Sequence, residues 1–471
     1  MAALAVTRFG LGARPGEIEE AAADPRGWLA AQIRREGAEQ PEGQWPGAQD
    51  RLQALARFRD QVRAIRAEFG LPARGVVSPA SGPVAGLQER FKAARRAAHK
   101  ALEDAALGEI LARGRLAAAT PAGFRERWAL FWSNHFTVGR KDEATQLLAP
   151  VFEREAIRPH VFGRFGNLLA AAVTHQAMLH YLDQPRSAGP GSAAGQRRGI
   201  GLNENLAREV LELHTVGPDA GYSQGDVTEF ARALTGYSIT NGRGDDLDAP
   251  LFRADFHEPG LRVVMGRSYA QDGPQDGAGQ ARAILADLAA NPATARHLAR
   301  KIAAHFVADV PPPALVSQLE AAYRAGGGDL AQVAAALIAA PEAWEHDPGK
   351  LKTPYEFIVS GWRAAGLQPG DAHGDLMAPL AGMGMRPFSA PQPNGWSDEA
   401  SVWGGPDGLV KRLHWSQAFA DAHAAGSDPE EAARQALGAR LTPAAARAVA
   451  RAESRAEGFA LLLMTPEFQR R

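Results

Sequence analysis

The sequence predicts a mainly α protein: a large, multi-helix, bundle-like fold with a small β-hairpin insertion. Ala and Leu give most segments a high helix propensity, and runs of alternating β-branched residues are few. Loops rich in Gly and Pro separate these segments, and the clearest cover residues 70–83, 184–201 and 241–280. Together these observations favour helices packed on one another over a sheet-based architecture.

The chain is long enough for several domains or one large one, because 471 residues exceed the usual size of a single domain. We expect an N-terminal helical part at residues 1–237, a loop and hairpin segment at 238–280, and a C-terminal helical part at 281–471. The same helices could also pack as one continuous domain.

The composition excludes several classes of site and partner. Lys and Arg number 52 against 53 Asp and Glu, so the net charge of −1 gives no overall field that attracts nucleic acid. The chain has no cysteine, which excludes disulfides, thiolate zinc sites, iron–sulfur clusters and a cysteine nucleophile. We therefore expect no nucleic-acid partner and no chemistry based on thiols.

No membrane insertion is expected either. Residues 165–182 are uncharged and nearly long enough to span a bilayer, but they include Asn167, Thr174 and Gln176, which are too polar for a lipid-facing helix. The first residues lack the basic region of a secretion signal. On this basis the expected location is the cytoplasm.

A helix is predicted over residues 120–135, with Thr120 as its cap. At about 100° per residue, Phe124, Trp128, Phe131 and His135 fall on one stripe of this helix. The side chain of His135 therefore points where the aromatic stripe points, into the core or into a cleft. Two interpretations stay open: a buried histidine bonded to a backbone carbonyl, or an acid–base group or metal ligand.

The most informative helix is predicted over residues 203–217, where four charged side chains share one face: Glu204, Arg208, Glu209 and Glu212. We name this the charged face. One interpretation is a solvated surface with Glu204–Arg208 and Arg208–Glu212 ion pairs, each worth about 0.2–0.5 kcal/mol. The other is a cleft in which crowded carboxylates raise one another's pKa or gather a cation. Glu209 and Glu212, three residues apart, can reach one ion.

The β-hairpin is predicted within residues 251–265. Residues 251–256 and 261–265 alternate imperfectly, and the sequence His-Glu-Pro-Gly between them is typical of a turn. His257 at this turn is either a further candidate metal ligand or a solvated side chain.

Further helices are predicted from residue 292, near 314–325 and 330–340, and from residue 429 onward. Thr353 and Glu356 have the spacing of a capping box, which predicts another helix start. In the loop that follows this helix, Trp396 and Trp403 lie beside turns rich in Pro and Gly. They either wall a substrate-binding pocket or cover the helical core.

Several signatures of known chemistry are missing from the sequence, namely a P-loop, GxGxxG, HExxH and ExxH. Common nucleotide-binding, zincin and ferritin-like di-iron sites are therefore not expected. An enzyme of this sequence would need a different arrangement of residues.

Eight segments of the chain resemble a known family: RFGLGARPGE, WSNHF, MLHYLDQ, NENLAREVLELHTVG, YSQGDVTEFARALTGY, FHEPG, KTPYEFIVSGWRA and PQPNGWSDEASVW. Their order and spacing match from about Leu4 to about Trp415. In these segments the chain resembles the large bacterial family named domain of unknown function eighteen hundred.

The name of that family records no activity, and the resemblance implies a predominantly helical fold. Many members resemble secreted proteins, and their genes often lie beside those of a second family that resembles sulfatases and carries twin-arginine signals. The resemblance therefore implies a sulfatase-like partner. Because this sequence lacks such a signal, we expect either a cytoplasmic protein or one that reaches the periplasm or the exterior by export with that partner.

Two functions are consistent with these patterns. The first is a hydrolase or lyase of a polymer or its fragments, with Glu209 or Glu212 as acid or base, Arg208 clamping an anionic group and His135 assisting. This chemistry could proceed without a metal or with a divalent ion. The second is a non-catalytic module that binds or escorts the sulfatase-like partner. The candidate metal ligands are Glu209, Glu212, His135 and His257, and the candidate substrate contacts are Glu204, Trp396 and Trp403.

Overall fold

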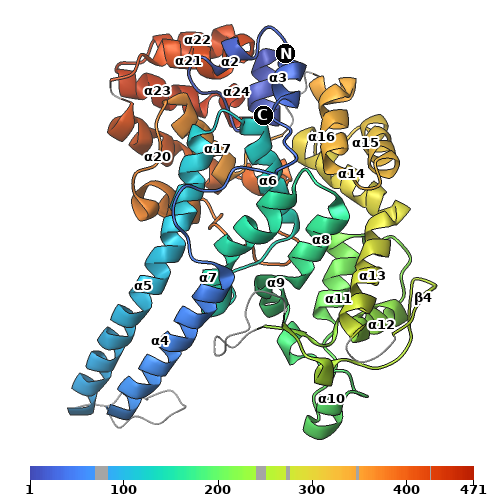
Figure 1. Ribbon diagram of the computed structural model, residues 1–471. Helices are drawn as coiled ribbons and strands as arrows, with labels where there is room; N and C mark the ends of the chain where they lie inside the picture. The colour runs from blue at the N-terminus through green and yellow to red at the C-terminus, as the bar shows by residue number, and fades with distance from the viewer. Residues whose placement is uncertain (69–82, 240–250, 272–275, 346–349, 425) are drawn as a thin grey trace.

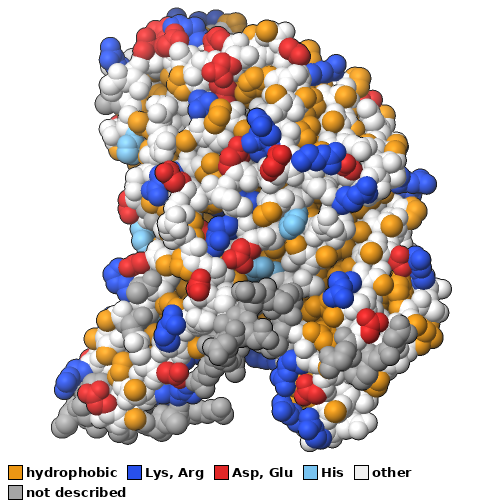
Figure 2. All heavy atoms as spheres, viewed as in Figure 1, with side chains coloured by type: hydrophobic (Ala, Val, Ile, Leu, Met, Phe, Trp, Pro, Cys, Tyr) orange, Lys and Arg blue, Asp and Glu red, His pale blue; other side chains and the backbone are white. Residues whose placement is uncertain are grey.

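The computed structural model describes residues 1–68, 83–239, 251–271, 276–345, 350–424 and 426–471, and it confirms a mainly α fold (Figure 1). Among these residues, no helix is both long and apolar enough to cross a membrane. Figure 2 shows acidic and basic side chains interspersed over most of the face in view, in keeping with the net charge of −1.

The first half of the chain forms short helices around two long ones. α4 and α5 pack against each other and project from the body as an arm (Figure 1). The helices are α1 (Ala2–Leu4), α2 (Glu17–Glu20), α3 (Pro25–Ala30), α4 (Ala48–Glu68), α5 (Pro83–Ala119), α6 (Gly123–His135), α7 (Glu143–Phe152), α8 (Phe165–Thr174), α9 (Gln176–Tyr181), α10 (Ala193–Arg198), α11 (Asn205–Glu209) and α12 (Gln224–Leu234). Wider π-helical turns continue three of them: η1 (Ala5–Phe9), η2 (Glu153–Ile157) and η5 (Val210–His214).

The second half is again helical. One of its helices, α17, lies in the middle of the molecule with α6, and most of the others gather in two groups on either side of these two helices (Figure 1). One group holds α13 (Gly277–Ala290), α14 (Pro292–Phe306), α15 (Pro313–Ala325) and α16 (Leu330–Ala339). The rest comprises α17 (Pro354–Ala364), α18 (Ala378–Gly382), α19 (Ala400–Trp403), α20 (Pro406–His423), α21 (Pro429–Leu437), α22 (Pro443–Ala450), α23 (Arg455–Met464) and α24 (Pro466–Gln469).

The small β-structure is present, but its pairing differs from the prediction. β2 (Leu251–Phe252) pairs with β1 (Tyr237–Ser238), and the hairpin joins β3 (Arg262–Val264) to β4 (Arg267–Tyr269). Its turn is formed by Met265 and Gly266, both with positive φ. The His257 segment is therefore not the hairpin turn. A short 3₁₀ turn, η6 (Ala254–Phe256), directs the chain inward before it.

Side-chain caps fix several helix starts. The Thr353 hydroxyl accepts a hydrogen bond from the Glu356 N–H at 3.3 Å, and the Glu356 carboxylate accepts one from the Thr353 N–H at 2.8 Å, so the predicted capping box of α17 is confirmed. α6 starts later than predicted, at Gly123. Thr120 instead accepts a hydrogen bond from the Ala122 N–H at 3.0 Å, in the turn before the helix.

Among the described residues, the two larger of four hydrophobic clusters form most of the core, and the first residues of the chain belong to both. One cluster runs from Leu4 to Trp344, and the other joins residues 355–468 to Leu11 and the end of α5. Arg363, only 1% exposed, donates hydrogen bonds to the carbonyls of Gly12 and Ala117 at 2.7 and 3.1 Å. These bonds satisfy a carbonyl at the C-terminal end of α5 that has no partner within its own helix. Arg363 thus ties α17 to the first residues of the chain and to the end of α5.

Candidate functional site

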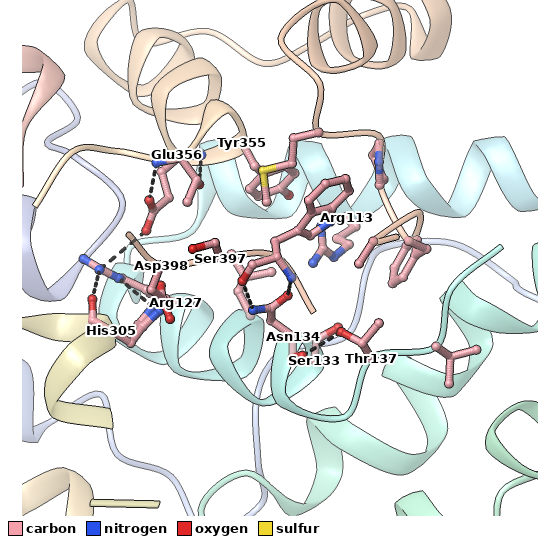
Figure 3. A pocket seen from close by; sticks show the side chains of 18 residues that line it. Arg113, Arg127, Ser133, Asn134, Thr137, His305, Tyr355, Glu356, Ser397 and Asp398 are labelled. Carbon is pink, nitrogen blue, oxygen red and sulfur yellow. Dashed lines mark hydrogen bonds and ion pairs between the residues drawn. The ribbon is translucent and has the colours of Figure 1, made fainter. Parts of the chain in front are cut away.

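Segments far apart in the sequence line one cavity of about 100 Å³ (Figure 3). They are α6, the start of α17, the loop 385–398, the end of α14 and one residue of α5. Part of the lining is apolar and part carries ionisable and hydroxyl groups, a mixture typical of small-molecule sites. The lining residues are Arg113, Arg127, Leu130, Ser133, Asn134, Thr137, Val138, His305, Thr353, Tyr355, Glu356, Met385, Pro387, Phe388, Ala390, Trp396, Ser397 and Asp398.

α6 separates the core from this cavity. The predicted stripe of Phe124, Trp128, Phe131 and His135 is buried in an aromatic cluster. The residues of α6 that line the cavity follow at helical spacing on its other side: Arg127, Leu130, Ser133 and Asn134. The aromatic stripe therefore anchors the helix, and its polar side supplies the wall of the cavity.

Asp398 and His305 form a pair at one end of the cavity. Nδ1 of His305 donates a hydrogen bond to Oδ1 of Asp398 at 2.7 Å. Burial lowers the pKa of His305 to about 3, although Asp398 acts to raise it. Burial acts to raise the pKa of Asp398, but His305, Lys350 and Arg127 outweigh it and lower this pKa to about 2. Near neutral pH the pair is thus a carboxylate held by a neutral imidazole.

Arg127 holds the His305 side of this pair through two hydrogen bonds. Its Nε donates to Nε2 of His305 at 3.3 Å, and its Nη2 donates to the His305 carbonyl at 3.2 Å. Because Nε2 accepts here, the ring hydrogen of His305 sits on Nδ1. Burial lowers the pKa of Arg127 to about 9, and Asp398 acts to raise it. Arg471 completes the network through ion pairs with Glu356 and Asp398.

Asn134 clamps the loop that carries Trp396. Its side-chain Nδ2 donates to the Trp396 carbonyl at 2.9 Å, and its Oδ1 accepts from the Trp396 N–H at 2.8 Å. Gly395 has a φ of +82°, and a Cβ there would lie 2.5 Å from the Asn134 carbonyl oxygen, so only glycine fits. The WSNHF and PQPNGW segments, both part of the family resemblance, meet at this clamp.

Arg113 and Tyr355 form another part of the cavity wall. Nε of Arg113 lies 2.9 Å from both carboxylate oxygens of Glu153. Its guanidinium carbon lies 4.8 Å from the centre of the Tyr355 ring and 5.1 Å from that of Phe388. The hydroxyl of Tyr355 is buried and has no hydrogen-bond partner among the described residues. Burial, opposed by Arg113, raises the pKa of Tyr355 to about 12, so this hydroxyl remains neutral.

On the predicted charged face, Glu204 and Arg208 make local contacts. Arg208 Nη2 lies 3.1 Å from Glu204 Oε2, and the two side chains are 40% and 29% exposed, respectively. Gln224 and Thr228 of α12 donate to the Glu204 carboxylate at 2.8 and 2.7 Å. Of the two predicted i,i+4 ion pairs, Glu204–Arg208 is present, and no Arg208–Glu212 pair forms within 4.0 Å. The bonds from Gln224 and Thr228 join Glu204 to α12.

Glu209 and Glu212 lie on the same face, and the charge of Glu212 acts on Glu209. Burial, and then the charge of Glu212, raise the pKa of Glu209, while Arg208 acts to lower it. This is the direction expected of crowded carboxylates. Burial, and then the charge of Glu212, raise the pKa of Tyr222. Whether these carboxylates perform chemistry stays a prediction.

His135 contacts the helix of the charged face, but on the opposite side from its carboxylates. Nε2 of His135 lies 3.2 Å from the carbonyl oxygen of the buried His214. Burial, and then Lys301, lower the pKa of His135 well below its usual value. His257 is also buried, with Nδ1 2.7 Å from the Thr235 carbonyl oxygen. Both histidines thus bind backbone carbonyls.

The structure does not gather the four predicted metal ligands. Within the described part of the chain, no group of three or more His, Asp or Glu side chains is placed to hold a metal ion. The geometry explains why, because Glu209 and Glu212 face outward from a helix whose buried side faces His135.

Of the two predicted tryptophans, Trp396 lines the cavity and Trp403 supports it. Their ring centres are 6.0 Å apart. Nε1 of the buried Trp403 donates to the Ser397 carbonyl at 2.8 Å. Trp396 thus lines a cavity, and whether that cavity binds a substrate stays a prediction.

A Gly-x-Ser-x-Gly sequence occurs at residues 221–225, with the spacing of a hydrolase nucleophile elbow. Ser223 is instead the N-cap of α12: its Oγ accepts from the Asp226 N–H and donates to the Asp226 carboxylate at 2.7 Å. An elbow needs a strand before the serine, and residues 215–222 form turns and coil. Residues 221–225 therefore form the start of α12 and not a nucleophile elbow.

The sequence did not reveal the residues that dominate the cavity: Arg113, Arg127, His305, Tyr355 and Asp398. A signal was available for two of them, since Tyr355 and Asp398 lie within KTPYEFIVSGWRA and PQPNGWSDEASVW. Nothing local distinguishes Arg113 or His305, because each occurs in an ordinary Ala-rich helix.

A comparison with protein families matches residues 4–470 to the family described as "Protein of unknown function (DUF1800)". Searches of curated proteins and of solved structures found no match. The family match spans nearly the whole chain, including every segment on which the resemblance rests. The chain therefore belongs to the DUF1800 family.

Proposed function

We propose that the chain is a hydrolase or lyase whose active site is the cavity between α6, α17 and the loop 385–398. The observation that carries this proposal is the Asp398–His305 pair, an ionised carboxylate held by a neutral imidazole at a cavity wall. Titratable groups whose pKa values are strongly shifted inside a cavity are the usual mark of a functional site.

The state of each group suggests its role. Asp398 stays ionised far below neutral pH, so it suits attack on the substrate or stabilisation of positive charge in the transition state, as the ionised carboxylate does in glycoside hydrolysis. His305 and Arg127 are positioning residues, because the first orients Asp398 and the second orients His305. Trp396 supplies a flat apolar wall against which a ring could stack.

The size of the cavity favours fragments over intact polymers. A volume of about 100 Å³ admits one small unit or the end of a chain. The reaction class is the one expected from the sequence, a carboxylate, arginine and histidine site, but the residues are different. Glu209, with its raised pKa, is the alternative acid if the charged face carries the reaction.

The proposal is tested by comparing Asp398→Asn with Asp407→Asn on a panel of chromogenic glycosides and esters. Asp407 is an exposed carboxylate on α20, paired with Lys411, so it controls for the same chemical change. We expect Asp398→Asn to lower turnover by at least about 100-fold and Asp407→Asn to leave it unchanged. Wild-type turnover by a folded Asp398→Asn variant would remove Asp398 from the reaction.

A further inference from the structure

The Arg113 end of the cavity carries hydrogen-bond donors that the protein itself does not use. Arg113 reaches Glu153 through Nε, and its two terminal nitrogens make no hydrogen bond to any described residue. The hydroxyl of Tyr355, a residue only 6% exposed, is likewise without a partner. A buried hydroxyl without a hydrogen-bond partner is unfavourable, so a ligand atom that accepts its hydrogen would gain binding free energy.

Glu153 cannot serve as that partner, because its oxygens are already occupied. It accepts hydrogen bonds from Arg113 Nε, from Arg158 Nε at 2.9 Å and from the Ser133 hydroxyl at 2.6 Å. Burial acts to raise its pKa, but Arg113 and Arg158 outweigh burial and lower the pKa to about 2. This carboxylate therefore holds the guanidinium in place and leaves the terminal nitrogens for a ligand.

The two aromatic rings beside Arg113 fix the plane of its guanidinium. Its central carbon lies 4.8 Å from the Tyr355 ring centre and 5.1 Å from the Phe388 ring centre. A guanidinium held in this way presents a flat fork, which matches the two oxygens of a carboxylate. In Figure 3, Arg113 lies toward one end of the cavity and Asp398 with His305 toward the other.

We propose that Arg113 and Tyr355 form a subsite that binds a carboxylate group of the ligand. The negative charge of Asp398 disfavours an anion at the other end, so the ligand enters in one orientation, with its carboxylate at Arg113 and its uncharged part at Asp398. This inference rests on the proposed function only in treating the bound ligand as the substrate of the reaction. It assigns an acidic compound, such as a sugar acid or another small carboxylic acid, to the site.

Benzoate and benzamide are suitable probes, since they have nearly the same size and differ in charge. Titration calorimetry on the full chain should show benzoate binding at least tenfold more tightly than benzamide. Tyr355→Phe and Arg113→Lys should each remove most of the preference for benzoate over benzamide. Tyr355→Phe should leave the midpoint of urea unfolding unchanged or raise it, because the hydroxyl has no partner to lose.

Matched controls separate the subsite from general effects of charge. Tyr222→Phe and Arg267→Lys change the same residue types outside the cavity and should leave benzoate affinity unaltered. Inorganic phosphate and sulfate test the shape of the anion, and tighter Tyr355-dependent binding of either would overturn the assignment to a carboxylate. Equal binding of benzoate and benzamide, or unchanged binding to both variants, would overturn the subsite.

The same titration distinguishes failure of this inference from failure of the proposed function. Asp398→Asn removes a negative charge from the cavity and should retain or tighten benzoate binding while turnover is lost. If benzoate binds as expected but Asp398→Asn keeps full turnover, the subsite stands and the proposed reaction site is wrong. If turnover is lost but benzoate does not bind, the reverse holds.

Discussion

The charged face of α11 and the cavity beside α17 contain the same kinds of side chain in different settings. On the charged face, Glu204 meets Arg208 four residues away, and both side chains are partly exposed. In the cavity wall, His305 meets Asp398 across 93 residues, and His305 is buried. Water screens the first pair, whereas burial lowers the pKa of His305 to about 3. Helix spacing in the sequence thus reveals the Glu204–Arg208 pair, which keeps its water, whereas only the fold brings His305 to Asp398.

The largest difference in stability should come from the arginines of the two regions. Arg127→Met leaves Glu356 without one of its charge partners and removes the bonds to the His305 carbonyl and ring, so we expect the free energy of unfolding to fall by about 3–5 kcal/mol. Arg208→Met should lower it by less than about 1 kcal/mol. Urea denaturation of both variants measures the difference, and similar losses would show that burial does not separate the two regions.

Carboxylate variants of the two regions should also differ in turnover. Asp398→Asn is expected to reduce turnover by at least about 100-fold, whereas Glu209→Gln should change it by less than about threefold. Steady-state kinetics of the two folded variants on one substrate makes the comparison. The opposite ranking would move the reaction to the charged face.

Acid should destabilise the protein through its buried histidines before it affects the charged face. Burial, and then Lys301 and His297, lower the pKa of His214 to about 3, so between pH 6.5 and 3 the unfolded chain binds a proton that the folded chain does not. Stability therefore falls as the pH drops, by up to about 1.4 kcal/mol per pH unit for each such histidine. Hydrogen bonds from Thr228 and Gln224 and the charge of Arg208 lower the pKa of Glu204, so its contribution is lost only below about pH 4.5.

His214→Phe tests this order, because both ring nitrogens of His214 lack a hydrogen-bond partner among the described residues and the ring lies beside those of His135 and Phe136. The variant should lose less stability than the wild type between pH 6.5 and 4.5 in unfolding experiments. Glu204→Gln should follow the wild-type curve over that range. A steep loss that His214→Phe does not reduce would assign the acid sensitivity to other groups.

The smallest expected effect concerns the clamp on the Trp396 loop. Asn134→Ala removes two hydrogen bonds to the Trp396 backbone and should lower the free energy of unfolding by about 1–2 kcal/mol. Gln224→Ala on the charged face should cost less than about 0.5 kcal/mol. Benzoate affinity should also weaken in Asn134→Ala, since the cavity wall loses its support. Unchanged stability and affinity would show that the loop is held by other contacts.

Much of the fold follows from local patterns in the sequence. The aromatic stripe of α6, the capping box of α17 and the ion pair between Glu204 and Arg208 depend on spacings of three to four residues, which helix geometry alone determines. The pairing of the β-strands could not be read in the same way. A 3₁₀ turn before His257 shifted the hairpin to the next pair of segments, and imperfect alternation does not fix a register.

The cavity could be predicted only in part. Trp396 was a candidate because tryptophan beside a rigid turn is unusual, whereas His305 and Arg113 look like ordinary members of Ala-rich helices. His305 and Arg113 line the cavity only because helices distant in the sequence pack together. The spacing of residues within one segment does not show which helices will pack. The same limit applies to His135, whose inward direction was predicted but whose distance from the charged face was not.

The contacts of the first residues affect how this protein can be made. Thr7 accepts a hydrogen bond from Arg440 at 2.7 Å, across 433 positions, and the Gly12 carbonyl accepts one from Arg363 across 351. At translation speeds of about 5–20 residues per second, roughly 20 to 90 s separate the synthesis of Thr7 from that of Arg440. During that interval the bond between Thr7 and Arg440 cannot form, so this contact of the first residues is completed only after residue 440 has been synthesised.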